Sequence, residues 1–155
     1  MRLLFVCLGN ICRSPTAEGV MRSLLAGNGY DGEIVVDSAG IGDWHVGSPP
    51  DERAVAAAAA RGFELGGTAR QVRPSDFEEF DLLVAMDSSN RDALLRMAPH
   101  PEAEAKVRML REFGDGVDAD VPDPYYGGAD GFAEVLEIIE RNCAALLEHV
   151  VNGRE

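Results

Sequence analysis

The sequence predicts an α/β fold: a single domain over residues 1–155, with a four-stranded parallel sheet flanked by helices on both faces, in three layers. Short apolar runs of strand length alternate with segments of helical periodicity along the chain. The runs are apolar almost without interruption, which is typical of parallel strands covered on both faces. A chain of 155 residues is long enough to bury the core of one such domain.

The elements alternate between strand and helix. The predicted strands are residues 3–6, 33–37, 81–86 and 106–110, and the predicted helices are residues 15–26, 51–61, 88–97 and 129–151. Pro15 suits the first turn of the first helix, where its missing N–H costs no hydrogen bond, and Asp87 is a typical cap for the third helix. Apolar residues recur every three or four positions in the last helix. Cys143 lies on that stripe, so we interpret it as a core residue.

The charge balance narrows the class of partner. The chain has 14 Lys and Arg residues against 27 Asp and Glu residues, a net charge of −13. A surface of this sign repels nucleic acid and anionic membranes, so we expect no nucleic-acid binding and no membrane insertion. The apolar run 3–8 is too short for a signal peptide core, and three cysteines form no secreted framework. These features, with arginine preferred over lysine, favour a bacterial, cytoplasmic protein, and export by a non-classical route stays open.

The segment after the first strand carries the chemistry. It reads Cys7-Leu8-Gly9-Asn10-Ile11-Cys12-Arg13-Ser14. A loop between a strand and a helix directs backbone N–H groups into a concavity that binds a tetrahedral oxyanion, so we expect residues 8–14 to bind phosphate. Cys7 would be the nucleophile at its floor, Arg13 offers a planar fork for two phosphate oxygens, and Ser14 stabilises the thiolate. The alternative, a cysteine merely buried at the end of a core strand, leaves Arg13 and the loop unexplained.

An acid is needed to protonate the leaving group of a phosphomonoester. Ligands of parallel sheets bind beyond the carboxyl ends of the strands, so loops after the later strands are expected to complete the site. We expect Asp123 to be this acid, and then the base that activates water, because Pro122 and Pro124 stiffen the loop around it. The alternative is that this Asp-Pro pair merely starts a turn, and Asp120 is the second candidate acid.

Three aromatic residues on the same loops are expected to contact the substrate: Trp44, Tyr125 and Tyr126. Flat apolar walls suit an aromatic leaving group such as a phosphotyrosine ring. In the competing interpretation, one of the two tyrosines packs under the last helix. The histidines are scattered along the chain, at His45, His100 and His149. We therefore expect neither a metal nor another cofactor.

Several landmarks recur together in one known family. They are Cys7 to Pro15, Ser38-Ala39-Gly40, Ala69-Arg70-Gln71, Ala85-Met86-Asp87 with Asn90, and Asp123-Pro124-Tyr125-Tyr126. With these, essentially the whole chain resembles the low-molecular-weight protein tyrosine phosphatases. The resemblance implies a flavodoxin-like sandwich and hydrolysis of phosphotyrosine and aryl phosphates through a phosphocysteine on Cys7. It also implies that Arg13 clamps the phosphate and transition state, that Asp123 is acid and base, and that Asn10 and Ser38 brace the loop.

The same resemblance implies regulation and partners. Cys12 is similar to a second loop cysteine that forms a reversible disulfide with the nucleophile under peroxide, which implies a redox-sensitive thiol. The implied partners are phosphotyrosine-containing proteins, such as a bacterial tyrosine kinase or a host protein, and we expect a monomer. One departure is visible, because the family often has a histidine three residues before the arginine of Ala69-Arg70-Gln71. Gly67 stands there in this chain, so part of the family's loop-bracing network is in doubt.

Other classes share the architecture or the loop. Arsenate reductases of this fold need two further cysteines, and residues 81–90 contain none. Protein-arginine phosphatases resemble this chain but carry a threonine where Ile11 stands. A phosphocysteine carrier subunit of a sugar phosphotransferase system must keep its phosphoryl group, which a water-activating Asp123 would remove. A catalytically inactive phosphopeptide-binding module is disfavoured because every catalytic role is filled.

Overall fold

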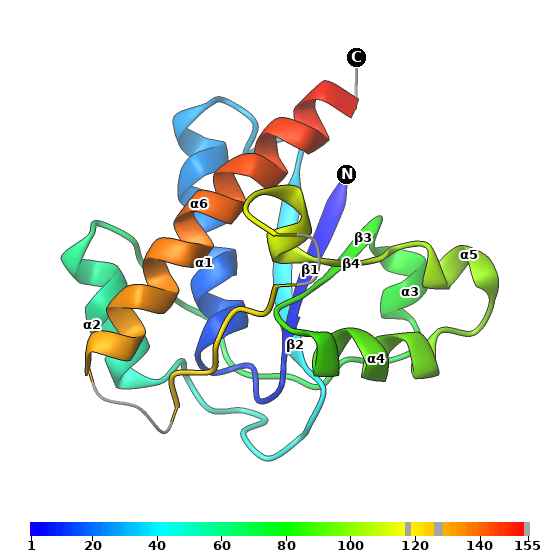
Figure 1. Ribbon diagram of the computed structural model, residues 1–155, viewed down its shortest axis with the longest axis horizontal. Helices are drawn as coiled ribbons and strands as arrows, with labels where there is room; N and C mark the ends of the chain where they lie inside the picture. Colours follow the sequence, from blue (N-terminus) through cyan, green and yellow to red (C-terminus); the bar gives the residue numbers. More distant parts are fainter. Residues whose placement is uncertain (117–118, 126–128, 154–155) are drawn as a thin grey trace.

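The four strands form one parallel sheet in the order β2-β1-β3-β4 (Figure 1). The computed structural model describes residues 1–116, 119–125 and 129–153. The strands are β1 Arg2–Cys7, β2 Val35–Gly40, β3 Leu82–Ala85 and β4 Val107–Met109. The predicted four-stranded parallel sheet is therefore confirmed.

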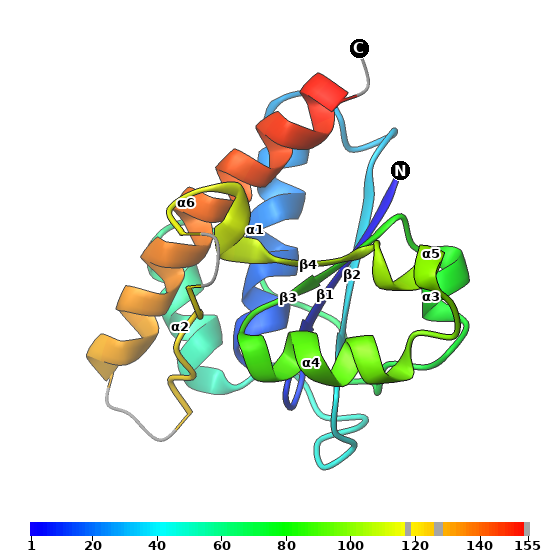
Figure 2. The same ribbon diagram turned by 45° about the vertical axis from the view of Figure 1, so that its right-hand side comes forward.

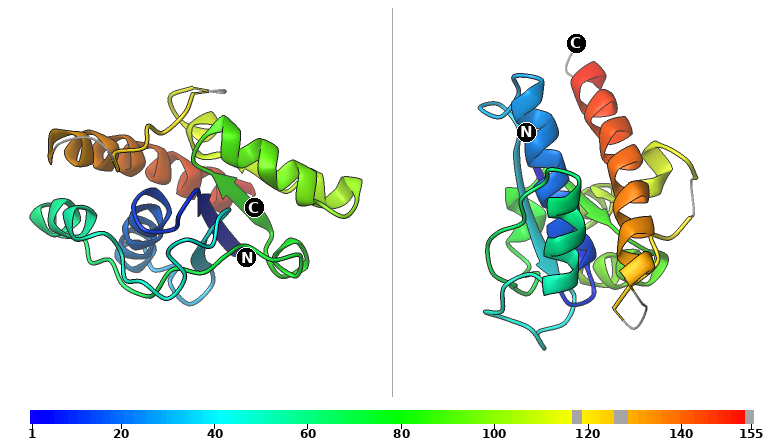
Figure 3. Two further views of the ribbon diagram at one scale, coloured as in Figure 1. Left: turned by 90° about the horizontal axis from the view of Figure 1, so that it is seen from below. Right: turned by 90° about the vertical axis from the view of Figure 1, so that its left-hand side faces the viewer.

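Helices cover both faces of this sheet, which confirms the predicted layers. They are α1 Arg13–Gly27, α2 Glu52–Ala60, α3 Asp76–Glu79, α4 Ser88–Met97, α5 Pro101–Glu104, the 3-10 helix η1 Leu110–Phe113, and α6 Ala129–Gly153. Figures 2 and 3 show α1, α2 and α6 on one side of the sheet and α3, α4 and α5 on the other. In the described part of the chain, no helix is both long and apolar enough to span a membrane.

The central strand β1 divides the core into two layers. Leu3 and Phe5 pack with α1 and α6 on one face, whereas Leu4 and Val6 pack with residues of α3, α4 and α5 on the other. Because successive side chains of a strand point to opposite faces, a strand buried on both faces must be apolar throughout. This is why the run that precedes Cys7 shows no alternation of polar and apolar residues.

Several details differ from the sequence-based expectation, among them Leu110, which begins η1 and does not belong to the fourth strand. The second strand lies at Val35–Gly40 rather than residues 33–37, so Ser38, Ala39 and Gly40 belong to the strand and not to the loop after it. Backbone pairing with β1 and a bridge between Gly40 and Gln71 hold these three small residues in the sheet. The short helices α3 and α5 were not predicted, because four residues are too few to show a helical period.

The topology sets the position of the site. From β1 the chain passes through α1 to β2 on one side of β1, and it later returns to β3 on the other side. The strand order therefore reverses at β1, and ligands of open α/β sheets bind at the carboxyl edge of such a switch point. Cys7 is the last residue of β1, which places the loop from Cys7 to Arg13 at this edge.

Candidate active site

The loop from β1 to α1 surrounds the sulfur of Cys7 with donors. The Asn10 backbone N–H donates to Cys7 Sγ over 3.2 Å, and Ser14 Oγ lies 3.0 Å from the same sulfur. α1 begins at Arg13, so the unpaired N–H groups and positive dipole end of its first turn also lie at this loop. Together these groups favour a negative charge at Cys7 and on an oxyanion bound beside it.

Asn10 adopts a left-handed conformation, with φ of 58°, and several hydrogen bonds hold it there. Its Nδ2 donates to Ser14 Oγ over 2.8 Å and to Ser38 Oγ over 3.0 Å, and its Oδ1 accepts from the Arg70 backbone N–H over 3.0 Å. Asn is among the few non-glycine residues that tolerate this region. Because Ser14 Oγ accepts from Asn10, its own hydroxyl hydrogen is available to donate to the sulfur.

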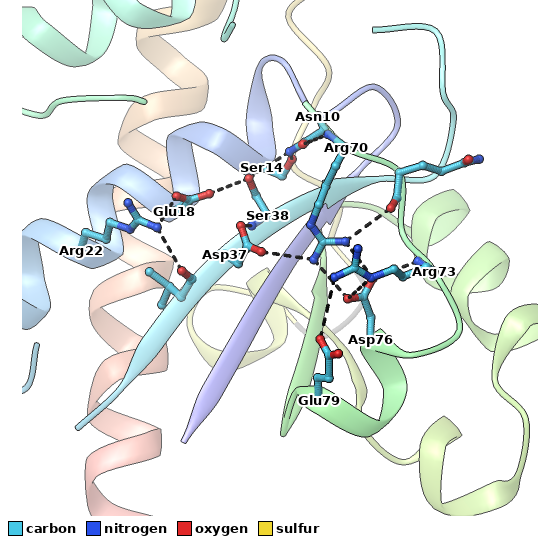
Figure 4. Close-up of polar contacts among 12 residues, drawn as sticks. Asn10, Ser14, Glu18, Arg22, Asp37, Ser38, Arg70, Arg73, Asp76 and Glu79 are labelled. Atoms are coloured by element: carbon cyan, nitrogen blue, oxygen red, sulfur yellow. Dashed lines mark hydrogen bonds and ion pairs between the residues drawn. The ribbon is translucent and has the colours of Figure 1, made fainter. Parts of the chain in front are cut away.

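A polar network behind the loop joins Ser38 to α1 (Figure 4). Ser38 Oγ donates to Glu18 Oε1 over 2.7 Å, and Arg22 pairs with Glu18 Oε2 over 2.8 Å. Burial raises the pKa of Glu18, and the hydrogen bond from Ser38 and the charge of Arg22 oppose this shift only in part. Ser38 thus links Asn10 to a buried carboxyl group.

A second part of this network fixes Arg70, whose backbone holds Asn10 (Figure 4). The Arg70 guanidinium donates to both oxygens of the buried Asp76 carboxylate, over 3.0 and 3.1 Å, and to Asp37 over 3.2 Å. The Arg73 backbone N–H also donates to Asp76. Gly67, where a histidine was expected from the resemblance, lies exposed with φ of 78°. Glu18 and Arg70 thus brace the loop without a side chain at residue 67.

Arg13 is buried at the end of the loop and is oriented by acceptors from two other loops. Its Nη1 donates to Asp87 Oδ2 over 2.6 Å and to the Val121 carbonyl over 2.9 Å, and its Nη2 lies 3.5 Å from Asp123 Oδ2. Burial disfavours the charged guanidinium, but the negative charge of Cys7 and the interactions with Asp87 and Asp123 outweigh it and raise the pKa of Arg13. Asp87, the predicted cap of α4, accepts from the Asn90 backbone N–H over 2.7 Å.

The structure separates the two candidate acids. Asp123 lines the pocket above Cys7, and its carboxylate is 40% exposed and accepts from the Tyr125 backbone N–H over 3.0 Å. The Asp120 carboxylate instead accepts from the Ser88 backbone N–H over 2.8 Å, at the start of α4. Asp120 does not line this pocket, so of the two candidates Asp123 is the one placed to reach a bound phosphate ester.

The pocket has a volume of about 330 Å³ and an aromatic mouth. Its lining residues are Cys7, Leu8, Gly9, Ile11, Cys12, Arg13, Trp44, His45, Asp123 and Tyr125. Trp44 is 70% exposed, so its ring is available at the rim. Tyr126 was also expected to contact the substrate, but it lies outside the described residues. The lining thus combines Cys7, Arg13 and Asp123, the candidate nucleophile, phosphate ligand and acid, with apolar walls that suit an aromatic group.

Two side chains near Tyr125, those of His45 and Arg53, were not identified from the sequence as site residues. The His45 ring lies 6.0 Å from the Tyr125 ring, measured between centroids. The guanidinium of Arg53, a residue of α2, lies 5.4 Å from the centroid of the same Tyr125 ring. Arg53 also covers the Phe132 ring at 4.7 Å and is held by Asp51, the cap of α2. The position of His45 directly after Trp44 was a usable signal, whereas nothing in the sequence joins Arg53 to Tyr125.

Burial disfavours the thiolate form of the other two cysteines. Burial, followed by the nearby charge of Asp51, raises the pKa of Cys12 to about 12. Cys143 is fully buried in α6, and burial raises its pKa as well. Cys143 belongs to the core on the α1 and α6 side of the sheet, as expected for a residue of the apolar stripe.

The donors around Cys7 and the burial of Cys12 predict the order in which these two thiols react. Treatment with iodoacetamide at neutral pH is expected to modify Cys7 first, because thiolate is the reactive form and the raised pKa of Cys12 keeps its thiol protonated. Fragment mass spectra of the peptide that contains both residues locate the modification. Added inorganic phosphate is expected to protect Cys7. Equal labelling of Cys7 and Cys12 at neutral pH would contradict the prediction.

Comparisons with known proteins agree with this geometry. The family model described as low molecular weight phosphotyrosine protein phosphatase matches residues 2–155. The low molecular weight protein-tyrosine-phosphatase of Streptomyces coelicolor is 47% identical, over 99% of this chain and 97% of that protein. A crystal structure of a protein tyrosine phosphatase from Entamoeba histolytica, with Hepes in its active site, superposes with a TM-score of 0.94 at 38% identity, covering 100% of this chain and 99% of that one. The structure of YfkJ from Bacillus subtilis gives a TM-score of 0.93 at 41% identity, covering 100% and 97%. The chain belongs to the low molecular weight phosphotyrosine protein phosphatase family.

Proposed function

We propose that this protein hydrolyses phosphotyrosine in protein substrates through a phosphocysteine on Cys7, with Asp123 as general acid and then general base. The observation that carries the proposal is the convergence of Cys7, Arg13 and Asp123 on one pocket with aromatic walls. Membership of a phosphotyrosine phosphatase family supports the same substrate class.

In the first step the Cys7 thiolate attacks phosphorus and the bond to the tyrosine oxygen breaks. Loop N–H groups and Arg13 bind the phosphoryl oxygens, on which negative charge is spread in the transition state. The Asp87 carboxylate and the Val121 carbonyl both accept hydrogen bonds from Arg13 Nη1, so the plane of the guanidinium is set before substrate binds. Asp123 gives its proton to the departing phenolate, which leaves as tyrosine.

In the second step water attacks the phosphocysteine. Asp123, now a carboxylate, takes a proton from this water, the sulfur–phosphorus bond breaks, and inorganic phosphate and the Cys7 thiolate are formed. The Ser14 hydroxyl, 3.0 Å from the sulfur, stabilises the thiolate that leaves. The roles are thus filled by Cys7, Arg13, Ser14, Asp123 and the loop N–H groups, and hydrolysis of the ester needs no co-reactant other than water.

A trapping experiment tests the proposal. A phosphotyrosyl peptide mixed with the enzyme and denatured within the first turnovers is expected to leave a phosphoryl group on Cys7, detectable by mass spectrometry. Vanadate, a phosphate analogue, is expected to prevent this labelling. Absence of phosphocysteine during steady turnover would overturn the mechanism. Phosphoarginine and arsenate serve as rival substrates, and faster turnover of either would transfer the assignment to an arginine phosphatase or an arsenate reductase.

The identity of the substrate protein is the finer question. A bacterial tyrosine kinase and a host protein both fit a pocket that recognises a phosphorylated tyrosine ring. A pull-down with Asp123→Ala, in which bound substrate turns over slowly, separates these two. A cytoplasmic location and a monomeric state stay predictions, to be checked by fractionation and by sedimentation.

A further inference from the structure

The chain just before Asp123 is fixed at two consecutive residues. The Ser88 N–H donates to Asp120 Oδ1 over 2.8 Å, and Arg111 Nη1 donates to the Asp120 carbonyl over 2.9 Å. At the next residue, the Val121 N–H donates to the Met86 carbonyl over 2.8 Å, and the Val121 carbonyl accepts from Arg13 Nη1. Four hydrogen bonds thus converge on residues 120–121, although Asp120 is exposed.

Arg111, which comes from η1, is itself firmly held. Its Nε and Nη2 donate to the two oxygens of Asp115 over 2.8 and 3.2 Å, in the bidentate geometry that leaves Nη1 for Asp120. The hydrogen bond from Arg111 is the main reason why the pKa of Asp115 is lowered. Asp115 also accepts from Arg141, and its backbone N–H donates to the buried Asn142, both on α6. Residue 120 is therefore anchored to the long C-terminal helix.

We propose that Arg111 and Asp120 are positioning residues for the general acid. They fix the backbone at residues 120–121, and Pro122, with its restricted φ, carries that placement to Asp123. Arg13 closes the arrangement, because the same guanidinium binds the Val121 carbonyl and lies 3.5 Å from the Asp123 carboxylate. The proposal rests on the role proposed above for Asp123. An error of about 1 Å in such a placement costs on the order of 10²-fold in rate.

The test uses the dependence of kcat/KM on the leaving group. Phenyl phosphate has a poor leaving group and needs the acid, whereas 2,4-dinitrophenyl phosphate expels a stable phenolate that needs little protonation. Arg111→Ala and Asp120→Ala are expected to lower kcat/KM for phenyl phosphate by about 10-fold or more, within the 10²–10⁴-fold contribution of a general acid. Their kcat/KM for the dinitrophenyl ester is expected to stay near the wild-type value.

Conservative and control variants separate positioning from other effects. Asp120→Asn keeps an acceptor for the Ser88 N–H but has no acidic proton, so it is expected to retain most of the activity that Asp120→Ala loses. Arg108→Ala is the matched control, because Arg108 pairs with Glu112 and covers Phe113 in the same segment. The double variant with Arg111→Ala and Asp123→Ala is expected to have the same kcat/KM on phenyl phosphate as Asp123→Ala alone, because both substitutions remove the same general-acid function.

The outcomes distinguish this proposal from the one on which it rests. If Asp123→Ala keeps wild-type kcat/KM on phenyl phosphate, the acid assignment itself is wrong. The positioning role is overturned if Asp123→Ala loses activity on phenyl phosphate but Arg111→Ala and Asp120→Ala do not. It is also overturned if kcat/KM of Arg111→Ala and Asp120→Ala falls equally on both esters. An Asp120→Asn variant as impaired as Asp120→Ala contradicts the hydrogen-bond explanation. Additive losses in the double variant contradict action through Asp123.

Discussion

Replacing Cys7 with serine is expected to abolish turnover of phosphotyrosine while leaving the phosphate site intact. The Asn10 N–H and the Ser14 hydroxyl stabilise a thiolate at residue 7, but a serine hydroxyl stays protonated in the same surroundings and is a poor nucleophile. The loop N–H groups and Arg13 are untouched by the change. The loss of kcat is expected to be on the order of 10⁵-fold or more, as for removal of a nucleophile from other covalent enzymes.

Two measurements on Cys7→Ser check this. Release of phosphate from a phosphotyrosyl peptide gives the loss of turnover, and calorimetric titration with inorganic phosphate shows whether the loop still binds an oxyanion. Cys12→Ser is the matched control, because Cys12 lines the same pocket but stays protonated at neutral pH. Residual hydrolysis in Cys7→Ser within a few-fold of wild type would remove Cys7 from the mechanism.

The fold was predictable because its information is local. Apolar runs such as residues 3–6 and caps such as Asp87 each identify an element from a few neighbouring residues. The prediction was wrong for residues 38–40, because serine and glycine, here Ser38 and Gly40, are typical of loops. Their strand conformation depends on pairing with β1 and with Gln71, and this is a contact between segments that the local sequence does not encode.

The candidate site also has a part that the local sequence predicts and a part that depends on contacts between distant segments. The loop after Cys7 was identified because nucleophile, glycine and arginine stand within eight residues of one another. The groups that orient this loop come from elsewhere in the chain: Arg70 holds Asn10, and Asp87 holds Arg13. The sequence identifies Asp87 as a helix cap, but its pairing with Arg13 depends on the packing of distant segments in three dimensions.

The anchor of the acid loop was beyond sequence reasoning for a related reason. Arg111 is an ordinary charged residue of a strongly acidic chain, and such residues usually lie on a solvated surface. Asp120 was identified from the sequence only as a second candidate acid, not as a residue that fixes the backbone. What distinguishes Arg111 is that Asp115 fixes its guanidinium in a geometry that leaves one donor for a backbone carbonyl. Such specificity lies in the directions of hydrogen bonds rather than in residue types or spacing.

Replacing Arg13 with lysine is expected to lower kcat/KM for every phosphate ester. Arg13 is almost fully buried, and Asp87 and the Val121 carbonyl fix its plane through Nη1. A lysine ammonium keeps the charge but offers no planar fork for two phosphoryl oxygens, and in this setting it is drawn to Asp87 and Asp123. Loss of an oriented donor to a transition-state oxyanion costs about 10²–10³-fold, so a fall of at least this size is expected.

The pattern across leaving groups separates Arg13 from the positioning residues. Arg13 acts on the phosphoryl oxygens, which are the same in phenyl and 2,4-dinitrophenyl phosphate, so both esters are expected to react more slowly in Arg13→Lys. Arg111→Ala is expected to affect only the phenyl ester. Arg61→Lys is the control for the substitution itself, because Arg61 pairs with Glu140 between α2 and α6. Arg13→Lys with undiminished kcat/KM on the dinitrophenyl ester would mean that a point charge is sufficient at this loop.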